Sequence, residues 1–588
     1  MPAIVLAIGV LSLFAIGFLG YSRYLSQKVF RLDPAYTTPA HRYQDGADFV
    51  PTNKHVLFGH HFTSVAGAAP IIGPAIAVYW GWMPALIWVV VGTIVAAGVH
   101  DFGALVMSVR HRARSVGTLT KDVVSPRAGI LFLVIVFFLI TMVGAVFAVV
   151  IANLFMANPG SVLPIFAEIP IAIAIGFYIR RSGSAALIPS LLGVAALYLF
   201  IWIGSALPIE LDGVAGLLGI ETRTLWIIVI LAYTFVAARL PVWALMQPRD
   251  YINSHQLFVA LAVVLLGVGV GWNTVVAPAL NDVPADTPSM WPFLFITIAC
   301  GAISGFHCLV SSGTTSKQLD KETDARLVGY GGAVGEGSLA LCSILAVTAG
   351  LAATRADWDA AYPSWTAASG GAVQNFVVGV GNFASNLGIP TDLAVIFGAV
   401  VVISFAATSL DTGIRLQRYV IQEIARMAGW RRLSDNVTLP AVITVVMAAA
   451  LALTPGGGDQ GFALGVLWQL FGTTNQLLAG LALATLAVWL LKRNTNPWMI
   501  LAPMVFLVVM TSWALVVNIQ LYIDNARAPG AEWSLWVLPP LSAVIFGLAL
   551  WVLFEAGAAL GKAWGSRGKE WRPSDSEEPN APLEDAKT

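Results

Sequence analysis

Apolar runs long enough to cross a lipid bilayer recur along almost the whole chain, and they constrain the fold more than any motif does. A transmembrane helix needs about 20 mostly apolar residues. We predict about fifteen such helices, near residues 3–21, 58–78, 84–108, 129–155, 163–179, 185–205, 224–246, 256–275, 292–315, 327–354, 391–412, 438–454, 461–491, 498–518 and 534–556. Charged residues make up 11% of the chain, whereas soluble proteins carry about 25%. The sequence therefore predicts an all-α integral membrane protein surrounded by the lipid bilayer.

The distribution of Lys and Arg orients the predicted helices, because cytoplasmic loops of membrane proteins collect basic residues. With the N-terminus outside and the C-terminus in the cytoplasm, only Arg223, Arg355 and Arg527 fall in outside loops. The segment 371–390 must then be a re-entrant or surface helix, since another span there would reverse every later loop. The net charge is zero, which gives no indication of a nucleic-acid partner. The oligomeric state is left open.

The predicted helices divide the chain into four parts. These are a first helix with a cytoplasmic loop at 1–57, a core at 58–412, a C-terminal transmembrane module at 413–556 and a polar, disordered cytoplasmic tail at 557–588. The ten helices of the core form two sets of five, 58–205 and 224–412. Because five is odd, the second set crosses the membrane upside down relative to the first, as in the inverted repeats of many transporters.

Helix-breaking residues interrupt the first helix of each set. In the first set this helix contains Ala69-Pro70-Ile71-Ile72-Gly73-Pro74. In the second set it contains Arg239-Leu240-Pro241-Val242, followed by Gln247-Pro248-Arg249-Asp250. Proline removes a backbone donor and clashes with the preceding turn, so both helices are expected to kink or unwind there. Two interruptions at corresponding positions favour a secondary transporter that binds its substrate at the midplane. The alternative is a purely structural kink, because Pro and Gly are common in membrane helices.

Small or polar residues near such helix interruptions are the candidate substrate-binding residues, namely Ser64, Gly67, Gly73, Ala75, Arg239, Ser304 and His307. A half-helix that begins at Pro74 would leave the N–H donor of Ala75 free for a substrate. Arg239 has the planar donor fork that binds carboxylates, although it could instead extend to the cytoplasmic interface. His307 lies in mid-helix and could equally be an ordinary hydrogen-bonded histidine.

Ionisable residues inside the predicted helices are the candidates for ion coupling, because a charge in a membrane helix is costly and usually functional. The predicted proton-coupling residues are Glu336, Asp101, His61 and His100, with structural pairing as the alternative. Sodium is the alternative coupling ion, since the hydroxyls between Ser311 and Ser316 could coordinate it. No metal-binding spacing occurs, so neither a metal nor another cofactor is predicted.

Six motifs occur in order between about residues 58 and 480 and carry a family resemblance. They are His60-His61-Phe62-Thr63-Ser64-Val65-Ala66-Gly67, Val99-His100-Asp101-Phe102, Gln247-Pro248-Arg249-Asp250-Tyr251, Ser311-Ser312-Gly313-Thr314-Thr315-Ser316-Lys317-Gln318, Glu322-Thr323-Asp324-Ala325-Arg326-Leu327-Val328-Gly329-Tyr330-Gly331 and Trp468-Gln469-Leu470-Phe471-Gly472-Thr473-Thr474-Asn475-Gln476-Leu477-Leu478. Together they resemble the carbon starvation protein A family. The resemblance implies a LeuT-type fold in a bacterial inner membrane and proton-coupled import of peptides or pyruvate during carbon starvation.

Two other classes of function agree less well with the sequence. An ion or solute channel would need a continuous polar stripe, whereas the polar residues gather in the inner half of the predicted helices. An enzyme would need a nucleophile with its base, or a metal site, and neither constellation is found. Peptide and pyruvate stay open as substrates, because both present a carboxylate.

Overall fold

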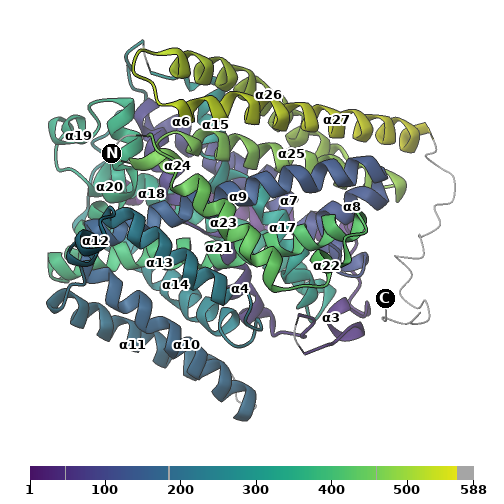
Figure 1. The fold of residues 1–588 in the computed structure, drawn as a ribbon, viewed down its shortest axis with the longest axis horizontal. Coiled ribbons are helices and arrows are strands. Elements are labelled where there is room, and N and C mark those ends of the chain that lie inside the picture. Colours follow the sequence, from purple (N-terminus) through teal and green to yellow (C-terminus); the bar gives the residue numbers. More distant parts are fainter. Residues whose placement is uncertain (47, 183–185, 286, 458–459, 566–588) are drawn as a thin grey trace.

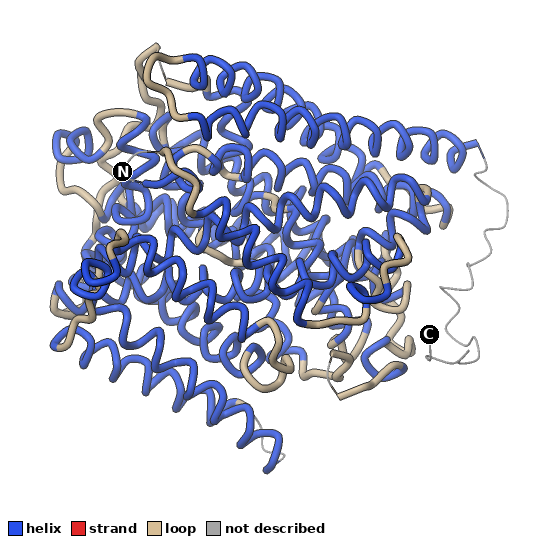
Figure 2. Tube along the Cα trace, in the orientation of Figure 1, coloured by secondary structure: helices blue, strands red, loops and turns tan. Residues whose placement is uncertain are grey.

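The computed structural model describes residues 1–46, 48–182, 186–285, 287–457 and 460–565. Helices make up most of this part of the chain (Figure 2), and it contains no strand beyond isolated bridges such as the one between Pro2 and Thr274. The all-helical fold predicted from the apolar runs is confirmed.

Eleven helical segments of the described residues are long and apolar enough to cross a membrane. They are Ala3–Val29 (with α1, Ala3–Ile16), Trp82–Arg110 (α6, Trp82–Val91, and α7, Gly98–Arg110), Pro126–Ala157 (α9), Pro159–Ser182 (with α10, Val162–Ser182), Leu187–Ala206 (α11), Met246–Gly271 (α14), Glu322–Gly350 (with α18, Gly331–Leu345), Thr391–Met427 (α21), Leu467–Lys492 (α25), Trp498–Arg527 (α26) and Trp533–Gly565 (with α27, Leu538–Gly565). These segments confirm the prediction of a multi-pass membrane protein.

Two further helix pairs pass the same test together but are sharply bent. They are α4 (Lys54–Val65) with Ala69–Trp80, which contains α5 (Ala69–Ala77), bent by 48°, and α12 (Asp212–Leu218) with α13 (Thr222–Ala237), bent by 96°. The predicted spans 292–315 and 438–454 correspond to the short helices α15 (Met290–Thr297), α16 (Ala299–Ala302) and α17 (Gly305–Gly313), and to α23 (Thr438–Ala452). The count of fifteen spans therefore stays a prediction.

The other helices are shorter or less apolar. They are α2 (Ser22–Tyr24), α3 (Pro39–Arg42), α8 (Val116–Val123), α19 (Arg355–Ala361), α20 (Trp365–Ser385), α22 (Arg431–Ser434) and α24 (Gly461–Gly465). The segment 371–390 falls in α20 and the turn after it, and α20 packs against α5, α14 and α21. In Figure 1, the N-terminus, α12 and α19 lie at one end of the molecule, and α3, α8 and α22 lie at the opposite end.

The helices form an inner bundle between two outer layers. The bent pair α4/α5, the pair α6/α7, the three pieces α15 to α17, and α18 pack together, with α9 beside α21. In Figure 1, α26 and α27 run along one edge and α10 and α11 along the other. These outer helices expose large apolar side chains, such as Ile188 and Phe554, which are 71% and 75% exposed. Lipid is the environment that such side chains fit.

Two predicted boundaries are corrected by the structure. Helix α13 ends at Ala237, so the Arg239-Leu240-Pro241-Val242 cluster lies in the connection to α14 and not inside a helix. Helix α27 continues to Gly565, so residues 557–565 are helical and not part of a disordered tail. The buried side chains of Ala556 and Ala563 extend the packed face of α27 beyond the predicted end. The rest of the predicted tail, 566–588, lies outside the described residues.

Candidate functional site

Two interrupted helices cross at their breaks in the inner bundle. The first is the bent pair α4/α5, which is interrupted as the sequence predicted, but at residues 66–68 and not at Pro70–Pro74. Pro70 lies in the first turn of α5 and Pro74 lies inside it, so no half-helix begins at Pro74. The second is α15 to α17, where Gly301 has a φ of +101° that L side chains rarely adopt. A Cβ atom on Gly73 would lie 2.2 Å from the carbonyl oxygen of Thr297, and one on Gly301 would lie 3.3 Å from Cα of Pro70. The two broken segments therefore meet through their backbones.

A small central cavity lies between the two breaks. Its walls include Gly67 and Ser304, both predicted as substrate-binding residues, together with Phe147, Ser409 and Phe471. Its volume is about 10 Å³, roughly the space of one water molecule. The central cavity is therefore too small for a substrate and would have to widen to hold one.

Three contacts hold the walls of the central cavity in place. Ser409 on α21 donates a hydrogen bond to the carbonyl of Ser64 at 3.1 Å. Asn475 on α25 donates to the Ser304 hydroxyl at 3.0 Å and accepts from the Phe306 N–H at 2.8 Å. The Asn475 amide thus pairs with the backbone N–H of Phe306, one of the donors that the start of α17 leaves without a helical partner. The Ser64 hydroxyl is buried and has no hydrogen-bond partner among the described residues.

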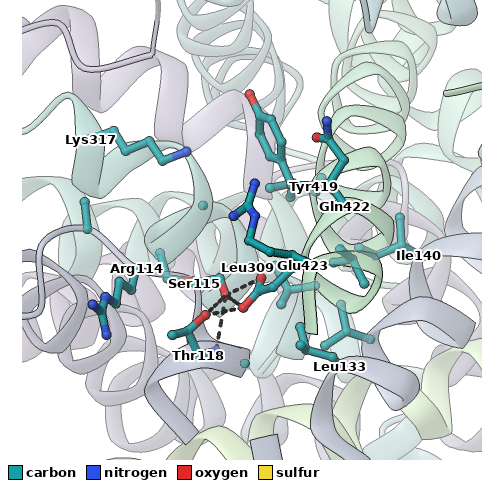
Figure 3. Close-up of a pocket in the computed structure, with 18 of the residues that line it drawn as sticks. Arg114, Ser115, Thr118, Leu133, Ile140, Leu309, Lys317, Tyr419, Gln422 and Glu423 are labelled. Carbon is teal, nitrogen blue, oxygen red and sulfur yellow. Dashed lines mark hydrogen bonds between the residues drawn. The ribbon is translucent and has the colours of Figure 1, made fainter. Parts of the chain in front are cut away.

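A larger cavity of about 480 Å³, here called the vestibule, opens between α8, α9, α17 and α21 (Figure 3). Its charged lining residues are Asp48, Arg114, Lys317, Glu423 and Arg426. The Glu423 carboxylate accepts hydrogen bonds from the hydroxyls of Ser115, at 2.9 Å, and Thr118. Arg114 is likewise held, by an ion pair with Asp122 at 2.8 Å, and Asp48 accepts a hydrogen bond from Tyr419.

The vestibule and the central cavity follow one another along the same helices. On α9 the vestibule wall ends at Ile140 and the central cavity begins at Val143, one turn further along. On α17 the corresponding residues are Leu309 and Phe306. The two spaces therefore lie about one helical turn apart along both helices.

A buried cluster of histidine and carboxylate side chains, here called the His307 cluster, lies next to the central cavity. Nδ1 of His307 is 2.7 Å from Oδ2 of Asp101, whose Oδ1 is 2.7 Å from Nδ1 of His100. On its other side, Nε2 of His307 lies 3.2 Å from Oε1 of Glu336. His307 and both carboxylates are 0% exposed. One imidazole thus lies between two carboxylates, three residues after the cavity wall at Ser304.

Glycines on α18 permit the close packing that forms the His307 cluster. A Cβ atom on Gly332 would lie 2.7 Å from Cδ2 of His61, and one on Gly335 would lie 2.5 Å from the Phe62 ring. The run of glycines around Glu336 thus lets α4 lie directly against α18. Nδ1 of His61 is 2.9 Å from the Thr315 hydroxyl, so His61 borders the cluster without bonding to its carboxylates.

Three predicted substrate-binding residues lie elsewhere. Gly73 is a packing residue at the crossing of the two breaks. Ala75 lies inside α5 and not at a helix start as predicted, and its carbonyl accepts a hydrogen bond from the Tyr362 hydroxyl at 3.0 Å. Arg239 is exposed, with its guanidinium 5.4 Å from the Phe235 ring centre. The structure does not bring Arg239 to the central cavity, because α13 ends before it.

A second charged cluster, here called the Arg249 cluster, was missed as a site by sequence reasoning. Arg249 on α14 donates to Asp411 on α21 and to the Tyr233 hydroxyl, and its Nε lies 3.8 Å from Oε1 of Glu168 on α10. The next residue, Asp250, lies 2.5 Å from Nδ1 of His60. The signal was available, because Glu168 is an acid inside a predicted span. Arg249 and Asp250 were overlooked as site residues because the Gln247-Pro248-Arg249-Asp250 motif was interpreted only as a helix break.

The interrupted helices, the closed central cavity and the vestibule define the class as a polytopic membrane transporter. The chain belongs to the carbon starvation protein CstA family, whose model matches residues 2–355 and 355–514. It is 33% identical to the peptide transporter CstA of Campylobacter jejuni, over 90% of this chain and 82% of that protein. It is 31% identical to the pyruvate/proton symporter BtsT of Escherichia coli, over 90% of this chain and 83% of that protein. These relatives place the chain among transport proteins and not among enzymes.

A solved structure supports the predicted LeuT-type architecture. The manganese transporter of Eremococcus coleocola superposes with a TM-score of 0.50, at 12% identity, over 88% of this chain and 99% of that one. At this identity the similarity concerns the fold alone.

Proposed function

We propose that this protein is a proton-coupled secondary transporter that imports a small carboxylate, pyruvate or a peptide, across the bacterial inner membrane. The observation that carries the proposal is the His307 cluster, in which a fully buried imidazole lies between Asp101 and Glu336. Such a group can gain and lose a proton with little movement of its neighbours. Because His307 lies three residues from Ser304, a change of protonation can act on the wall of the central cavity.

The inverted repeat is part of the same proposal, with a changed second half. The sequence placed the second broken helix at 224–246, but the break that crosses α4/α5 lies in α15 to α17. We therefore propose that the second repeat begins near residue 290 and not at 224. The substrate would bind where the two breaks cross, as in other transporters of this plan.

The charges of the vestibule favour an anionic substrate. Three basic residues, Arg114, Lys317 and Arg426, line it with two acidic ones, Asp48 and Glu423. Arg114 is paired with Asp122 and Glu423 is held by two hydroxyls, so Lys317 and Arg426 are the basic groups on which the proposal depends. Basic groups in a cavity with low-dielectric walls raise the local concentration of carboxylates. Pyruvate and peptides both carry this group, so the relatives' two named substrates are the first to test.

Proteoliposome transport with labelled pyruvate and a labelled dipeptide tests this function. One of the two substrates is expected to accumulate when an inward proton gradient is imposed, and the accumulation should disappear when an ionophore collapses that gradient. Accumulation driven by a sodium gradient alone would make sodium the coupling ion. Equilibration without accumulation under either gradient would instead indicate a channel.

The proposed orientation places the N-terminus outside and α22 in the cytoplasm. Single cysteines at the exposed positions Asp282 and Glu532 should react with a membrane-impermeant maleimide added outside intact cells. A cysteine at exposed Arg431 should react only after the membrane is opened. The parent chain is the control, because Cys308 and Cys342 are buried and Cys300 is half-buried. Opposite labelling of the two groups would reverse the proposed topology.

A further inference from the structure

The Arg249 cluster holds three buried carboxylates that the proposed function does not use. They are Glu168 on α10, Asp250 on α14 and Asp411 on α21, and each is at most 3% exposed. They come from three different helices, and His60 joins them from α4. Buried carboxylates need charge partners or protons, because an isolated ionised carboxylate in a low-dielectric interior is very costly.

Two of the three carboxylates each have hydrogen-bond donors on one oxygen. Asp411 accepts hydrogen bonds from Arg249 and, at 2.8 Å, from the Tyr233 hydroxyl. Asp250 is paired with Nδ1 of His60. This contact requires only a proton on Nδ1, so the neutral form of His60 is sufficient. Oδ1 of Asp411 has no partner among the described residues, but each aspartate has a donor on its Oδ2.

Glu168 is different, because neither of its oxygens has a hydrogen-bond partner in the part of the chain that the structure describes. Arg249 is its nearest cation, but the separation of 3.8 Å exceeds hydrogen-bond distance. Among the described residues, the amide of Asn253 is the one neutral donor directed at Glu168, and it also donates to the Thr408 hydroxyl at 3.1 Å. The geometry around Glu168 thus fits a protonated, neutral carboxyl group.

The charge balance of the surroundings leads to the same assignment. The acids Glu168, Asp250 and Asp411 face two guanidinium groups, those of Arg249 and Arg415. Three negative and two positive charges leave one negative charge in excess when His60 is neutral. Helix α11, which packs along α10, carries Tyr198 as its one titratable group. One added proton makes the cluster neutral, and Glu168 is the acid that lies beyond hydrogen-bond distance of both guanidinium groups and of His60.

We propose that Glu168 is a second proton-binding site of the transporter, separate from the His307 cluster. In the structure, where we assign Glu168 as protonated, Arg249 bonds to Asp411. When Glu168 loses its proton, its carboxylate attracts Arg249 away from Asp411. Asp411 lies two residues after Ser409, which lines the central cavity and bonds to the Ser64 carbonyl. His60 lies one helical turn before Ser64 on α4. The protonation of Glu168 is thus linked to the first break by two routes: through Asp411 to Ser409 on α21, and through Asp250 and His60 to Ser64 on α4. This link to transport rests on the proposed function, but proton binding itself does not.

Infrared spectroscopy of the purified full-length protein in lipid nanodiscs tests proton binding without any transport. Protonated carboxyl groups give a C=O stretching band that ionised carboxylates lack. The wild-type protein is expected to show this band in mildly acidic buffer and to lose intensity in alkaline buffer. Glu168→Gln should lose the component that belongs to Glu168, whereas Glu168→Asp should keep a protonated component at a shifted frequency. Glu336→Gln is the matched control from the His307 cluster, and the Glu168 component should persist in it.

An unchanged band in Glu168→Gln would overturn the proposal, because Glu168 would then be ionised at every pH tested. Failure of Glu168→Gln to fold while Glu168→Asp folds would also overturn it, since glutamine mimics the protonated form and not the charged one. The result is independent of the proposed function. If no substrate is transported, the Glu168 component still reports whether the site binds a proton.

Discussion

Replacing Glu336 by Gln is expected to abolish gradient-driven accumulation of substrate while sparing substrate exchange across the membrane. Glutamine has the shape of a protonated glutamate but cannot release a proton. Because Oε1 of Glu336 lies 3.2 Å from His307 and is shielded from solvent, no water-exposed group can take its place. With one proton per substrate, a gradient of about one pH unit supports about tenfold accumulation, and the variant should lose all of it.

The measurement compares accumulation and exchange of the same labelled substrate in proteoliposomes. Asp101→Asn is the matched control, because Asp101 accepts from both His100 and His307 at 2.7 Å and therefore holds the His307 cluster together. This variant is expected to lower folding or binding, so accumulation and exchange should fall together. Accumulation by Glu336→Gln vesicles under an imposed proton gradient would remove Glu336 from the coupling mechanism.

Replacing Gly73 by Ala is expected to reduce uptake and exchange together, by about tenfold or more. The added Cβ atom would lie 2.2 Å from the Thr297 carbonyl oxygen, which belongs to the backbone and cannot rotate away. Helices α5 and α15 must then separate at the point where the two breaks cross. Overpacking of this kind costs about 1–3 kcal/mol, and about 1.4 kcal/mol corresponds to a factor of ten in an equilibrium.

Transport per folded protein and the thermal unfolding temperature measure this effect. The matched control is Gly547→Ala on α27, because a Cβ atom there meets nothing within 4 Å. It should behave like the wild type in both measurements. Equal transport by the two variants would show that the crossing tolerates separation, and the backbone contact would then not set the geometry of the central cavity.

Much of the candidate site could be predicted residue by residue. Asp101, Glu336 and His307 stand out in the sequence because a charged or titratable group in an apolar helix is a local and strong signal. Their mutual contacts could not be predicted, since they lie on α7, α18 and α17, and 206 residues separate Asp101 from His307. Glu168 was overlooked although the same signal marked it, and only its position beside Arg249 distinguishes it.

The two helix interruptions also differ in how far the sequence alone predicts them. The first break, at residues 66–68, directly precedes Pro70, and a proline is well placed in the first turn of a new helix because it has no N–H to leave unpaired. The second break is at Ile298–Ser304, a stretch without proline, where the unusual backbone angle of Gly301 depends on packing against Pro70 and Ala340. Prolines near Arg239 therefore suggested a break that the tertiary structure places between helices.

The sequence by itself determined the membrane class, the all-helical fold, the first break and the family, because apolar length, proline and motif order are properties of single segments. Only the tertiary structure decided which buried groups meet, where the cavities lie and which helix forms the second break. Burial makes each charge costly wherever it lies along its helix, whereas its partner depends on how helices distant in the chain pack together. His307 between Asp101 and Glu336 is the result of that packing.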